Sequence, residues 1–575
     1  MKQKIICAIL TALLLTTGCA QQQSPVSSQS VVPPSQTQAG TEIPTMAAMP
    51  EEAPDAPISE NNVEVLRIGT IYGNDVFSLT SQADNYGRMN YNAFCQAPFV
   101  VMNEYNEVQP FFFRSWEISP DGKEITFTIP DNAVWHDGVP VTAEDVIFTF
   151  EYCRDVRKIG SFLTLQSVEA RDATTIHAVF GSSIIYRMLR NGAPTTYIMP
   201  KHIWENVEEP SSYAEPDAAI GCGPFKYIRA DKDAQISYYE SVGKNYFAGE
   251  ITIDKIELHS FDSWETMVMA LRSDNVDALY NYSSSVDANL IPLLLNDSNI
   301  NIGQSQNTGN YQLIFGMENG ATSDLEFRKA LTLAFDYELL GQTIGGSYAQ
   351  TPGLGIIAPP NKGFDESLPL HTYDIDAAMA ILDAAGYIDV DGNGFRKTPD
   401  GDEINLIIIP HRSTSIQELY MRISEVLQQN LKAIGINSTI ETECLSNADI
   451  WEAKLTDGEY NLFPSYCTYG VASYDTCARY IIGTVEIEGS FKWGQCNIPE
   501  YLEAFYELER ATDDEEYVKL VNTLQRIHAE ELPAIALTWN HVFIPYRTDR
   551  LENWVIFPGA GPINPKTWFT LTNKS

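Results

Sequence analysis

The sequence predicts a mixed α/β fold, and two hydrophobic patterns lead to this expectation. Segments in which apolar residues alternate with polar ones, such as 63–69 and 124–129, predict β-strands. Segments with one apolar face at helical spacing, such as 264–272, predict amphipathic helices. Strands and helices interleave from residue 63 onward, so we expect an α/β architecture rather than separate all-α and all-β domains.

Each predicted element has a local reason in the sequence. Thr142 precedes Glu144 and Asp145, which is the pattern of an N-cap followed by an acidic first turn, so a helix is predicted to begin there. Glycines that close apolar periodic segments predict helix ends. Besides the strands named above we expect strands at 253–258 and 405–409, and helices at 324–341, 374–386, 415–435, 500–510 and 514–531.

The first residues have the pattern of an export signal. Lys2 and Lys4 precede a short apolar segment that ends at Gly18-Cys19. That segment is shorter than the roughly 20 residues that a membrane-spanning helix needs. We therefore predict a signal peptide at 1–18. Gly18-Cys19 resembles the end of a bacterial lipobox, which implies lipidation of Cys19 and anchoring of the protein to the cell membrane; the alternative is an ordinary cleaved signal.

The segment 19–62 is rich in Gln, Ser, Pro, Thr and Ala, and it carries no Lys or Arg. Such a composition buries too little apolar surface to offset the entropy of ordering the chain. We predict a disordered tether. Anchor, tether and a large folded body together indicate a protein that works outside the cytoplasm, either in a periplasmic space or on the outer face of the cytoplasmic membrane.

Charge and composition exclude several classes of function. The 575 residues have a formal net charge of −39 and 44% hydrophobic residues. An acidic chain of this kind is unsuited to nucleic acid, because phosphate recognition depends on Lys and Arg. For the same reason we expect contact with the membrane through the lipid anchor alone. The hydrophobic content is that of a packed globular protein.

Seven cysteines follow the predicted anchor, and none forms a C-x-x-C pair. We expect buried thiols rather than a disulfide framework in a body of this size. The sequence contains no H-E-x-x-H, G-x-S-x-G, P-loop or dinucleotide-binding motif, and no His lies at metal-ligand spacing from another His or Cys. We therefore expect no catalytic residues, no enzyme activity and no cofactor other than calcium.

Calcium is considered because of one loop. Asp389, Asp391 and Asn393, followed by Gly394, match the opening of a calcium-binding loop, and Asp400 stands at its twelfth position in place of the usual Glu. Asp, Asn and Gly are also the residues of ordinary turns. Both interpretations, a turn and a calcium site, stay open at this point.

Several motifs in one order along the chain give a resemblance to a known family. The clearest are Trp116 to Gly122, Trp135-His136-Asp137-Gly138 leading to Thr142, and Gly221-Cys222-Gly223-Pro224-Phe225. They are followed by Phe327-Arg328-Lys329-Ala330 with Asp336, and by Ala384-Ala385-Gly386-Tyr387. Together they resemble the extracellular solute-binding proteins of family 5, the peptide- and nickel-binding components of bacterial ABC importers. The motifs themselves are interpreted as structural, with Trp116 and Trp135 as core or turn residues.

The resemblance implies a periplasmic-binding-protein-like fold of type II, with two lobes, a hinge between them and an extra subdomain in the first lobe. We expect lobe I at 63–107, 220–310 and 535–575, the inserted subdomain at 108–219, and lobe II at 311–534. The family closes its lobes around a ligand and docks on a membrane permease. The implied partners are the permease and ATPase subunits of an ABC transporter and a peptide or another small organic ligand.

The resemblance also places the ligand in the cleft between the lobes. Tyr466 aligns with a Trp that forms a wall in oligopeptide binders, and Tyr469 stands near the Asp that grips the peptide amine there, unless a gap makes Asp475 its substitute. This puts binding of peptides through a free amine in doubt, because a buried unpaired ammonium is costly. The other candidate ligand-binding residues are Tyr72, Asn74, Asn310, Tyr311, Trp539 and Asn540.

The sequence therefore predicts an extracytoplasmic solute-binding protein that captures a ligand, with peptides as the leading class, and delivers it to an ABC permease. Another organic solute or a metal chelate is the alternative ligand. A secreted hydrolase with an acidic pair, and a sensor or adhesion module that kept the fold, are the rival classes of function.

Overall fold

The computed structural model describes residues 62–71, 93–103, 107–192, 194, 196–210, 213, 215–280, 285–306, 310–318, 320–359, 361–413, 416–467, 474–483, 493–539, 541–557 and 561–574. All structural statements below concern these residues. The predicted signal peptide, Cys19 and all of the predicted tether except Asn62 lie outside them. In the described part of the chain, no helix combines the length and the apolar character that crossing a bilayer requires.

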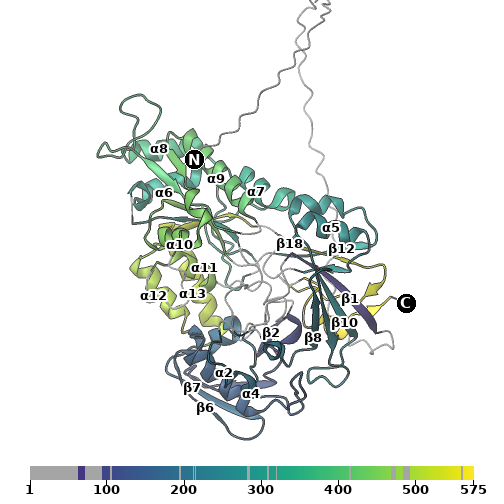
Figure 1. The fold of residues 1–575 in the computed structure, drawn as a ribbon. Helices are drawn as coiled ribbons and strands as arrows, with labels where there is room; N and C mark the ends of the chain where they lie inside the picture. The colour runs from purple at the N-terminus through teal and green to yellow at the C-terminus, as the bar shows by residue number, and fades with distance from the viewer. Residues whose placement is uncertain are drawn as a thin grey trace, which may run out of the picture. The chain divides into compact units, whose positions relative to one another are not determined.

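Helices and strands interleave as the sequence predicts (Figure 1). The longer helices are α2 (Ala143–Asp155), α5 (Trp264–Arg272), α6 (Leu325–Ala334), α7 (Tyr337–Gly345), α8 (Ile375–Ala384), α9 (Gln417–Ala433), α10 (Ala448–Thr456), α11 (Tyr474–Ile481), α12 (Pro499–Leu508) and α13 (Asp514–Glu531). Three short helices among the described residues are α3 (Ile185–Arg187), α4 (Lys201–Trp204) and α14 (Thr567–Thr570).

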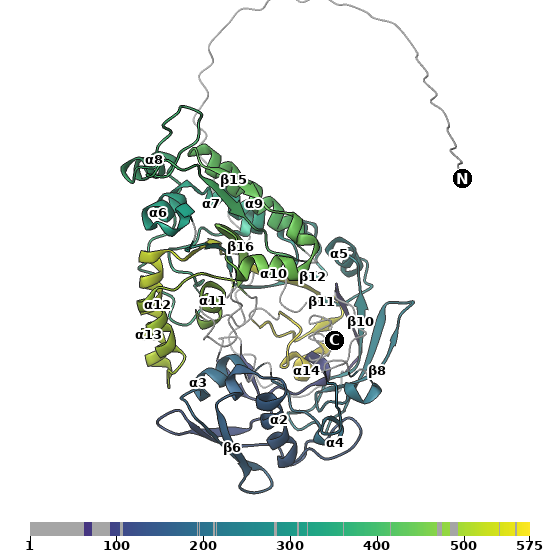
Figure 2. The same cartoon turned by 60° about the vertical axis from the view of Figure 1, so that its left-hand side comes forward.

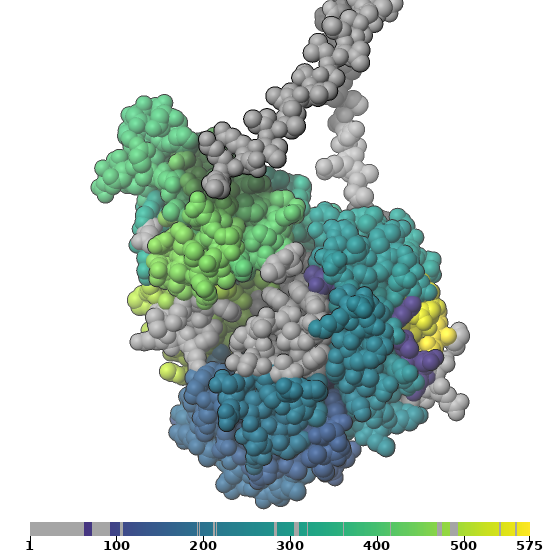
Figure 3. Space-filling view, in the orientation of Figure 1, coloured from purple at the N-terminus to yellow at the C-terminus, as the bar shows by residue number. Residues whose placement is uncertain are grey.

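One sheet has seven strands and draws them from distant parts of the sequence. Its order is β12 (Ile300–Gln306), β18 (His541–Arg547), β11 (Ala278–Leu279), β1 (Val63–Thr70), β10 (Ile253–Ser260), β9 (Ile236–Ser241) and β8 (Phe225–Asp231). These strands lie within the residues predicted for lobe I. Near this sheet, the Asn573 side chain donates to the Asn62 carbonyl oxygen, 2.6 Å away, and Figure 3 shows early (purple) and late (yellow) parts of the chain next to each other.

A second sheet has five strands and is covered on both faces. Its order is β15 (Asn437–Ile440), β14 (Asn405–Ile408), β16 (Leu462–Cys467), β13 (Asn310–Phe315) and β17 (Ala534–Thr538). Alternate residues of a strand point to opposite faces. Accordingly, Leu313 and Phe315 pack in a core with residues of α6–α9, whereas Ile314 packs in a core with residues of α10–α13. Figures 1 and 2 both show α12 beside α13.

The segment predicted as the inserted subdomain contains a sheet of its own. The order is β4 (Ser115–Ile118), β5 (Glu124–Thr128), β7 (Thr175–Phe180) and β6 (Leu165–Ala170), and all neighbours are antiparallel. Helix α2 begins as predicted, because Thr142 and Asp145 form a capping box in which the Asp145 carboxylate accepts from the Thr142 backbone N–H at 2.8 Å. Two strand pairs complete the fold: β2 (Val100–Met102) with β3 (Val108–Pro110), and β19 (Leu551–Glu552) with β20 (Thr572–Asn573).

The motif residues have the structural roles that the sequence predicts. Trp135 is buried in the core of this part of the chain, and Trp116 is half-buried in β4. Gly223 lies so close to the chain at Cys95 that a Cβ would come within 2.4 Å of the Cys95 carbonyl carbon. Any side chain there would clash with backbone, so the Gly–x–Gly spacing reflects close packing of two chain segments.

Two predicted boundaries differ from the structure. The predicted helix 324–341 is wrong as a single element: α6 ends at Ala334 and α7 begins at Tyr337, because the Asp336 side chain accepts from the Leu339 backbone N–H and caps a new helix. The predicted return to lobe I at residue 535 falls inside β17, which pairs with β13 in the five-stranded sheet. The change of sheet therefore comes after Thr538. The other division points of the lobes remain predictions.

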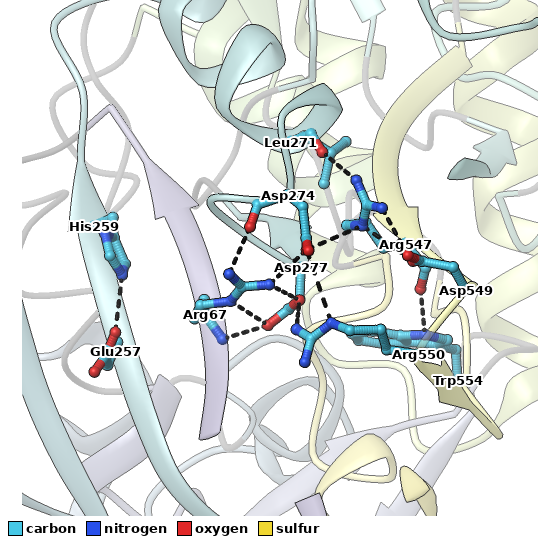
Figure 4. A network of polar contacts seen from close by, with 10 residues as sticks. All are labelled: Arg67, Glu257, His259, Leu271, Asp274, Asp277, Arg547, Asp549, Arg550 and Trp554. Carbon is cyan, nitrogen blue, oxygen red and sulfur yellow. Dashed lines mark hydrogen bonds and ion pairs between the residues drawn. The ribbon is translucent and has the colours of Figure 1, made fainter. Parts of the chain in front are cut away.

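Asp277, directly before β11 of the seven-stranded sheet, carries a buried charge (Figure 4). Its carboxylate accepts from the Arg67 guanidinium at 2.8 Å and 3.1 Å and from the Arg67 backbone N–H at 2.9 Å, and it also contacts Arg550. Its backbone bridges two strands, since its N–H donates to the Arg67 carbonyl and its carbonyl accepts from Arg547, each at 2.7 Å. The hydrogen bond to Asp277 is the main reason that the pKa of Arg67 is raised.

We expect Asp277→Ala to lower the free energy of unfolding by about 3 kcal/mol, because it leaves two guanidinium groups without their shared buried partner. Urea unfolding monitored by circular dichroism measures this change. The matched control is Asp155→Ala, which removes an exposed carboxylate paired with Arg154 and should change stability little. Equal effects of the two substitutions would contradict the role assigned to Asp277.

His371 is buried against an aromatic ring in the core on the α6–α9 face. Its imidazole is stacked on Tyr337 with 4.5 Å between ring centroids. Burial, with a smaller contribution from His528, lowers the pKa of His371 to about 3. The folded protein thus holds this side chain neutral, whereas the unfolded chain protonates it near its ordinary pKa of 6.5.

The unfolded state binds more protons below pH 6.5, so this group makes the folded state less stable as the pH falls from about 6.5 toward 3. When the pH is lowered from about 6.5 to about 4.5, we expect the free energy of unfolding of His371→Phe to fall by about 2 kcal/mol less than that of the wild type. Urea unfolding at both pH values gives the slope of the free energy of unfolding against pH. Leu340→Met, a volume-conserving change in the same core, should keep the wild-type slope. An unchanged slope in His371→Phe would contradict the prediction.

Candidate functional site

The chain passes between the two sheets twice, and the strand ends that flank these two passages lie at one place. Strand β12 pairs antiparallel with β18, ending with Gln306 opposite His541. Strand β13 pairs antiparallel with β17, beginning with Tyr311 opposite Thr538. The chain therefore leaves the seven-stranded sheet after Gln306 and returns to it at His541, and the described residues that flank the two passages are strand neighbours. We call the edge of the five-stranded sheet at these passages the crossing edge.

Strand directions bring the ends of four strands to the crossing edge. Strands β14 and β16 are parallel, so their carboxyl ends lie at the same edge. Strand β13 runs antiparallel to β16 and to β17, so its first residues lie there together with the last residues of β17. Ligands in open α/β sheets bind outside the carboxyl ends of strands, which makes this edge the candidate site.

Four of the predicted ligand-binding residues lie at the crossing edge: Asn310, Tyr311, Tyr466 and Trp539. Tyr311 is directly opposite Tyr466 in the β13–β16 register, and their ring centroids are 6.0 Å apart. Tyr466 is half-buried, and Tyr311 is buried. The structure thus brings together two aromatic residues that are far apart in the sequence. Tyr72, Asn74, Tyr469 and Asn540 lie outside the described residues, so their predicted roles stay predictions.

Trp539 packs against the segment that follows α7. Its backbone exchanges two hydrogen bonds with Gln350, at 2.8 Å and 3.0 Å, and its ring lies 5.5 Å from the ring of Phe364. The indole is 6% exposed, and its Nε1 donates to no hydrogen-bond acceptor within the described part of the chain. Trp539 therefore offers a buried donor at the return passage, although most of its surface is used for packing.

A polar cluster that sequence reasoning missed lies beside Asn310. Gln312 and Ser465 face each other across β13 and β16 and are at most 1% exposed. Among the described residues, neither polar atom of the Gln312 side chain, nor the Ser465 Oγ, nor the Asn310 Oδ1 has a hydrogen-bond partner. Such an atom costs roughly 1–3 kcal/mol when it stays unpaired. The cluster therefore places unpaired polar atoms inside the protein, close to the start of β13. The sequence signal for this cluster was Gln312, a polar residue in an apolar strand, two positions from Asn310 and therefore on the same face.

Aromatic residues that sequence reasoning also missed lie beside Tyr466. The His411 ring, just after β14, lies 5.0 Å from Tyr420, 5.4 Å from Trp451, 5.7 Å from Trp493 and 6.3 Å from Tyr466. Burial lowers the pKa of His411 to about 4, so the imidazole is neutral near pH 7. This surrounding is aromatic and uncharged. No sequence spacing links these residues, because they come from separate elements.

Asp475, the predicted substitute for the amine anchor, is already paired inside the protein. Asp475 is 2% exposed. Its carboxylate accepts a hydrogen bond from the Asn191 Nδ2 at 2.5 Å and lies 3.6 Å from the Arg187 Nε. Arg187 also pairs with Glu509 at 3.1 Å, and Arg479 contacts the same Glu509. Burial raises the pKa of Glu509. Asp475 is thus a member of a buried ion-pair network that joins α3 and the following turn to α11 and α12.

The possible calcium loop lies away from the crossing edge, after α8, and its residues make turn contacts. Asp389 accepts from the backbone N–H groups of Gly392, Asn393 and Gly394, at 2.8 Å, 3.1 Å and 2.9 Å. Asp391 pairs with Lys397 at 3.0 Å, and Asp400 is exposed in a separate turn. Within the described ranges, no group of three or more His, Cys, Asp or Glu is arranged to hold a metal ion. These contacts favour the turn interpretation over the calcium site.

Residues 107–481 match the family of bacterial extracellular solute-binding proteins, family 5. A putative ABC transporter peptide-binding protein of Brucella abortus is 26% identical over 289 residues, which cover 49% of this chain and 52% of the relative. The chain thus spans about half the length of the Brucella relatives that it matches.

Longer matches agree with this family. The dipeptide-binding protein of Escherichia coli is 23% identical over 484 residues, which cover 79% of this chain and 84% of the relative. The solved structure of a periplasmic oligopeptide-binding protein from Thermotoga maritima superposes with a TM-score of 0.74 at 21% identity, covering 89% of this chain and 99% of that one. The chain therefore has the two-lobed α/β fold of these structural neighbours.

The family match covers more than half of the sequence, from β3 through α11, and includes the strands that form the crossing edge except β17. This chain belongs to the bacterial extracellular solute-binding proteins of family 5.

Proposed function

We propose that this protein is an extracytoplasmic solute-binding protein that captures a peptide between its two lobes and delivers it to the permease of an ABC transporter. We further propose that a lipid on Cys19 anchors it to the cell membrane and that residues 19–62 form the tether. The protein carries no catalytic role in this proposal, in keeping with its membership of a family of binding proteins.

The crossing edge is the observation that carries the proposal. The aromatic pair Tyr311 and Tyr466, the buried polar cluster on the opposite face of β13, and the strand ends that flank both passages lie at this edge. A ligand that contacts both lobes beside the passages has a higher affinity for the closed arrangement, and it shifts the population toward that arrangement. A transporter can then distinguish loaded protein from empty protein by shape.

The peptide class is supported by the chemistry of the edge and by the relatives. Aromatic walls with a few polar groups suit a sizeable organic ligand whose amides need hydrogen bonds. The relatives from Brucella and Escherichia coli are named as peptide- and dipeptide-binding proteins. Asp475 is engaged by Arg187 and Asn191, so the proposal assigns it to the internal network rather than to the ligand amine.

The first test is a thermal-shift titration of the protein, unfolded and refolded to remove copurifying ligand, with defined pools of di-, tri- and longer peptides. A bound peptide at a hundredfold excess over its dissociation constant stabilises the folded state by about 2.7 kcal/mol, which raises the melting temperature. Tyr466→Ala should weaken binding at least tenfold, because it removes an aromatic wall at the crossing edge. Tyr373→Ala, at a 47% exposed tyrosine, is the matched control and should bind as the wild type does.

A failure of every peptide pool to shift the melting temperature would contradict the peptide class. Mass spectrometry of the material released by unfolding then identifies another organic solute or a chelate. Turnover of a chromogenic ester or glycoside would contradict the assignment as a binding protein.

The second test concerns Asp475. We expect Asp475→Asn to lower the melting temperature, because Arg187 loses a buried charge partner, and to change the affinity for a free-amine peptide less than tenfold. Calorimetric titration with a peptide and its N-acetylated form measures the comparison. If Asp475→Asn lost the free-amine peptide but kept the acetylated one, Asp475 would be the amine anchor and this part of the proposal would be wrong.

A further inference from the structure

Two cysteines that are ten positions apart in the sequence meet in the interior. Cys467 is the last residue of β16, and Cys477 lies in α11. Both are fully buried, and their Sγ atoms are 2.6 Å apart. The other cysteines of the described residues, Cys95, Cys153, Cys222, Cys444 and Cys496, are buried as well.

Separate contacts hold the two elements that carry these thiols. Strand β16 pairs with β13 along its whole length, including Cys467 opposite Asn310. Helix α11 is held by Tyr474, whose hydroxyl lies 3.1 Å from that of Tyr501, and by the ion pair of Arg479 with Glu509. The thiols therefore meet because two elements are positioned independently, and a bond between them needs no large movement of either element.

The protein belongs to a family of extracellular binding proteins, which work in compartments where protein thiols are oxidised. We propose that Cys467 and Cys477 form a disulfide bond in the exported protein. The bond links the end of β16, next to Tyr466, to the first turns of α11, next to Asp475. In the covalent structure, the bond closes a ring from position 467 to position 477.

The oxidant is a disulfide of an exported thiol–disulfide oxidoreductase, for which oxidised glutathione substitutes in the test tube. The thiolate of one cysteine attacks that disulfide, forms a mixed disulfide and releases one thiolate. The thiolate of the second cysteine then attacks the mixed disulfide, forms the Cys467–Cys477 bond and releases the other thiolate. In total the two protein thiols lose two protons and two electrons, and the oxidant's disulfide is reduced to two thiols.

Burial decides when this exchange takes place. Contact with Cys467 and removal from water both raise the pKa of Cys477, so little thiolate forms in the folded protein. We therefore place the exchange during folding, before α11 covers the end of β16. Once formed, the bond is shielded from thiols in solution by the same burial.

Peptide mapping tests the bond directly. The mature protein is exported by the host, purified without reductant, unfolded, alkylated with iodoacetamide and cleaved with trypsin. Residues 455–479 form one tryptic peptide that contains both cysteines, and residues 433–454 form another that contains Cys444. We expect the first peptide to be unlabelled and two hydrogen atoms lighter than its dithiol form, and to take two labels after reduction. The Cys444 peptide is the internal control and should take one label without reduction.

Melting curves supply a second, independent readout that needs no ligand. Dithiothreitol present throughout unfolding should lower the melting temperature of the wild type, because the closed ring no longer restricts the unfolded chain. It should have no effect on the double variant Cys467→Ala/Cys477→Ala, and the control Cys444→Ala should keep the wild-type sensitivity. Cys477→Ala alone should expose one alkylatable thiol in peptide 455–479.

Two labels on peptide 455–479 in unreduced exported protein would overturn the proposal. So would a melting temperature that dithiothreitol changes equally in the wild type and in the double variant. Neither result depends on which solute the protein binds, so failure of the disulfide and failure of the proposed peptide binding are separate outcomes.

Discussion

The fold depends on the antiparallel pairing that places the strand ends before and after both passages between the sheets side by side. Strand β12 pairs with β18 in one sheet, and β13 pairs with β17 in the other. Gln306 is therefore opposite His541, and Tyr311 is opposite Thr538. This pairing determines which strand ends share the crossing edge.

The pairing of these strands determines which side chains lie together at the crossing edge. Because β13 starts where β14 and β16 end, the aromatic residues Tyr311, Tyr466 and His411 gather at one place. The same strand carries the buried Gln312 on its other face. Aromatic side chains on one face and buried polar groups on the other are features that suit an organic ligand.

Charge is handled differently in the interior and on the surface. The chain has 76 acidic and 37 basic residues, and two of its buried carboxylates lie beside arginines. Asp277 is paired with Arg67 and Arg550, and Asp475 lies beside Arg187. A buried carboxylate without such a partner would be strongly destabilising. The surplus of negative charge therefore lies in solvent, where it favours solubility outside the cell.

Local patterns in the sequence were sufficient for much of the fold. Alternation predicted β1 and β10, periodicity predicted α5 and α13, and the Thr142 cap marked the start of α2, because these signals are contained in a few neighbouring residues. The family was identified from motifs in order along the chain. The break between α6 and α7 was missed because the apolar periodicity runs on through Asp336, whose capping role appears only in the folded chain.

The sequence by itself determined the fold class, the family and many of the individual helices and strands, and it named Tyr311 and Tyr466 as candidates. Tertiary structure alone decided that these two tyrosines are opposite each other, that His411 and Trp493 join them, that Asp475 is occupied by Arg187, and that Cys467 meets Cys477. The physical reason is the range of the interactions. Caps, turns and periodicity act between close neighbours in the chain, whereas strand register and helix packing bring together residues whose separation in sequence carries no information about their distance in space.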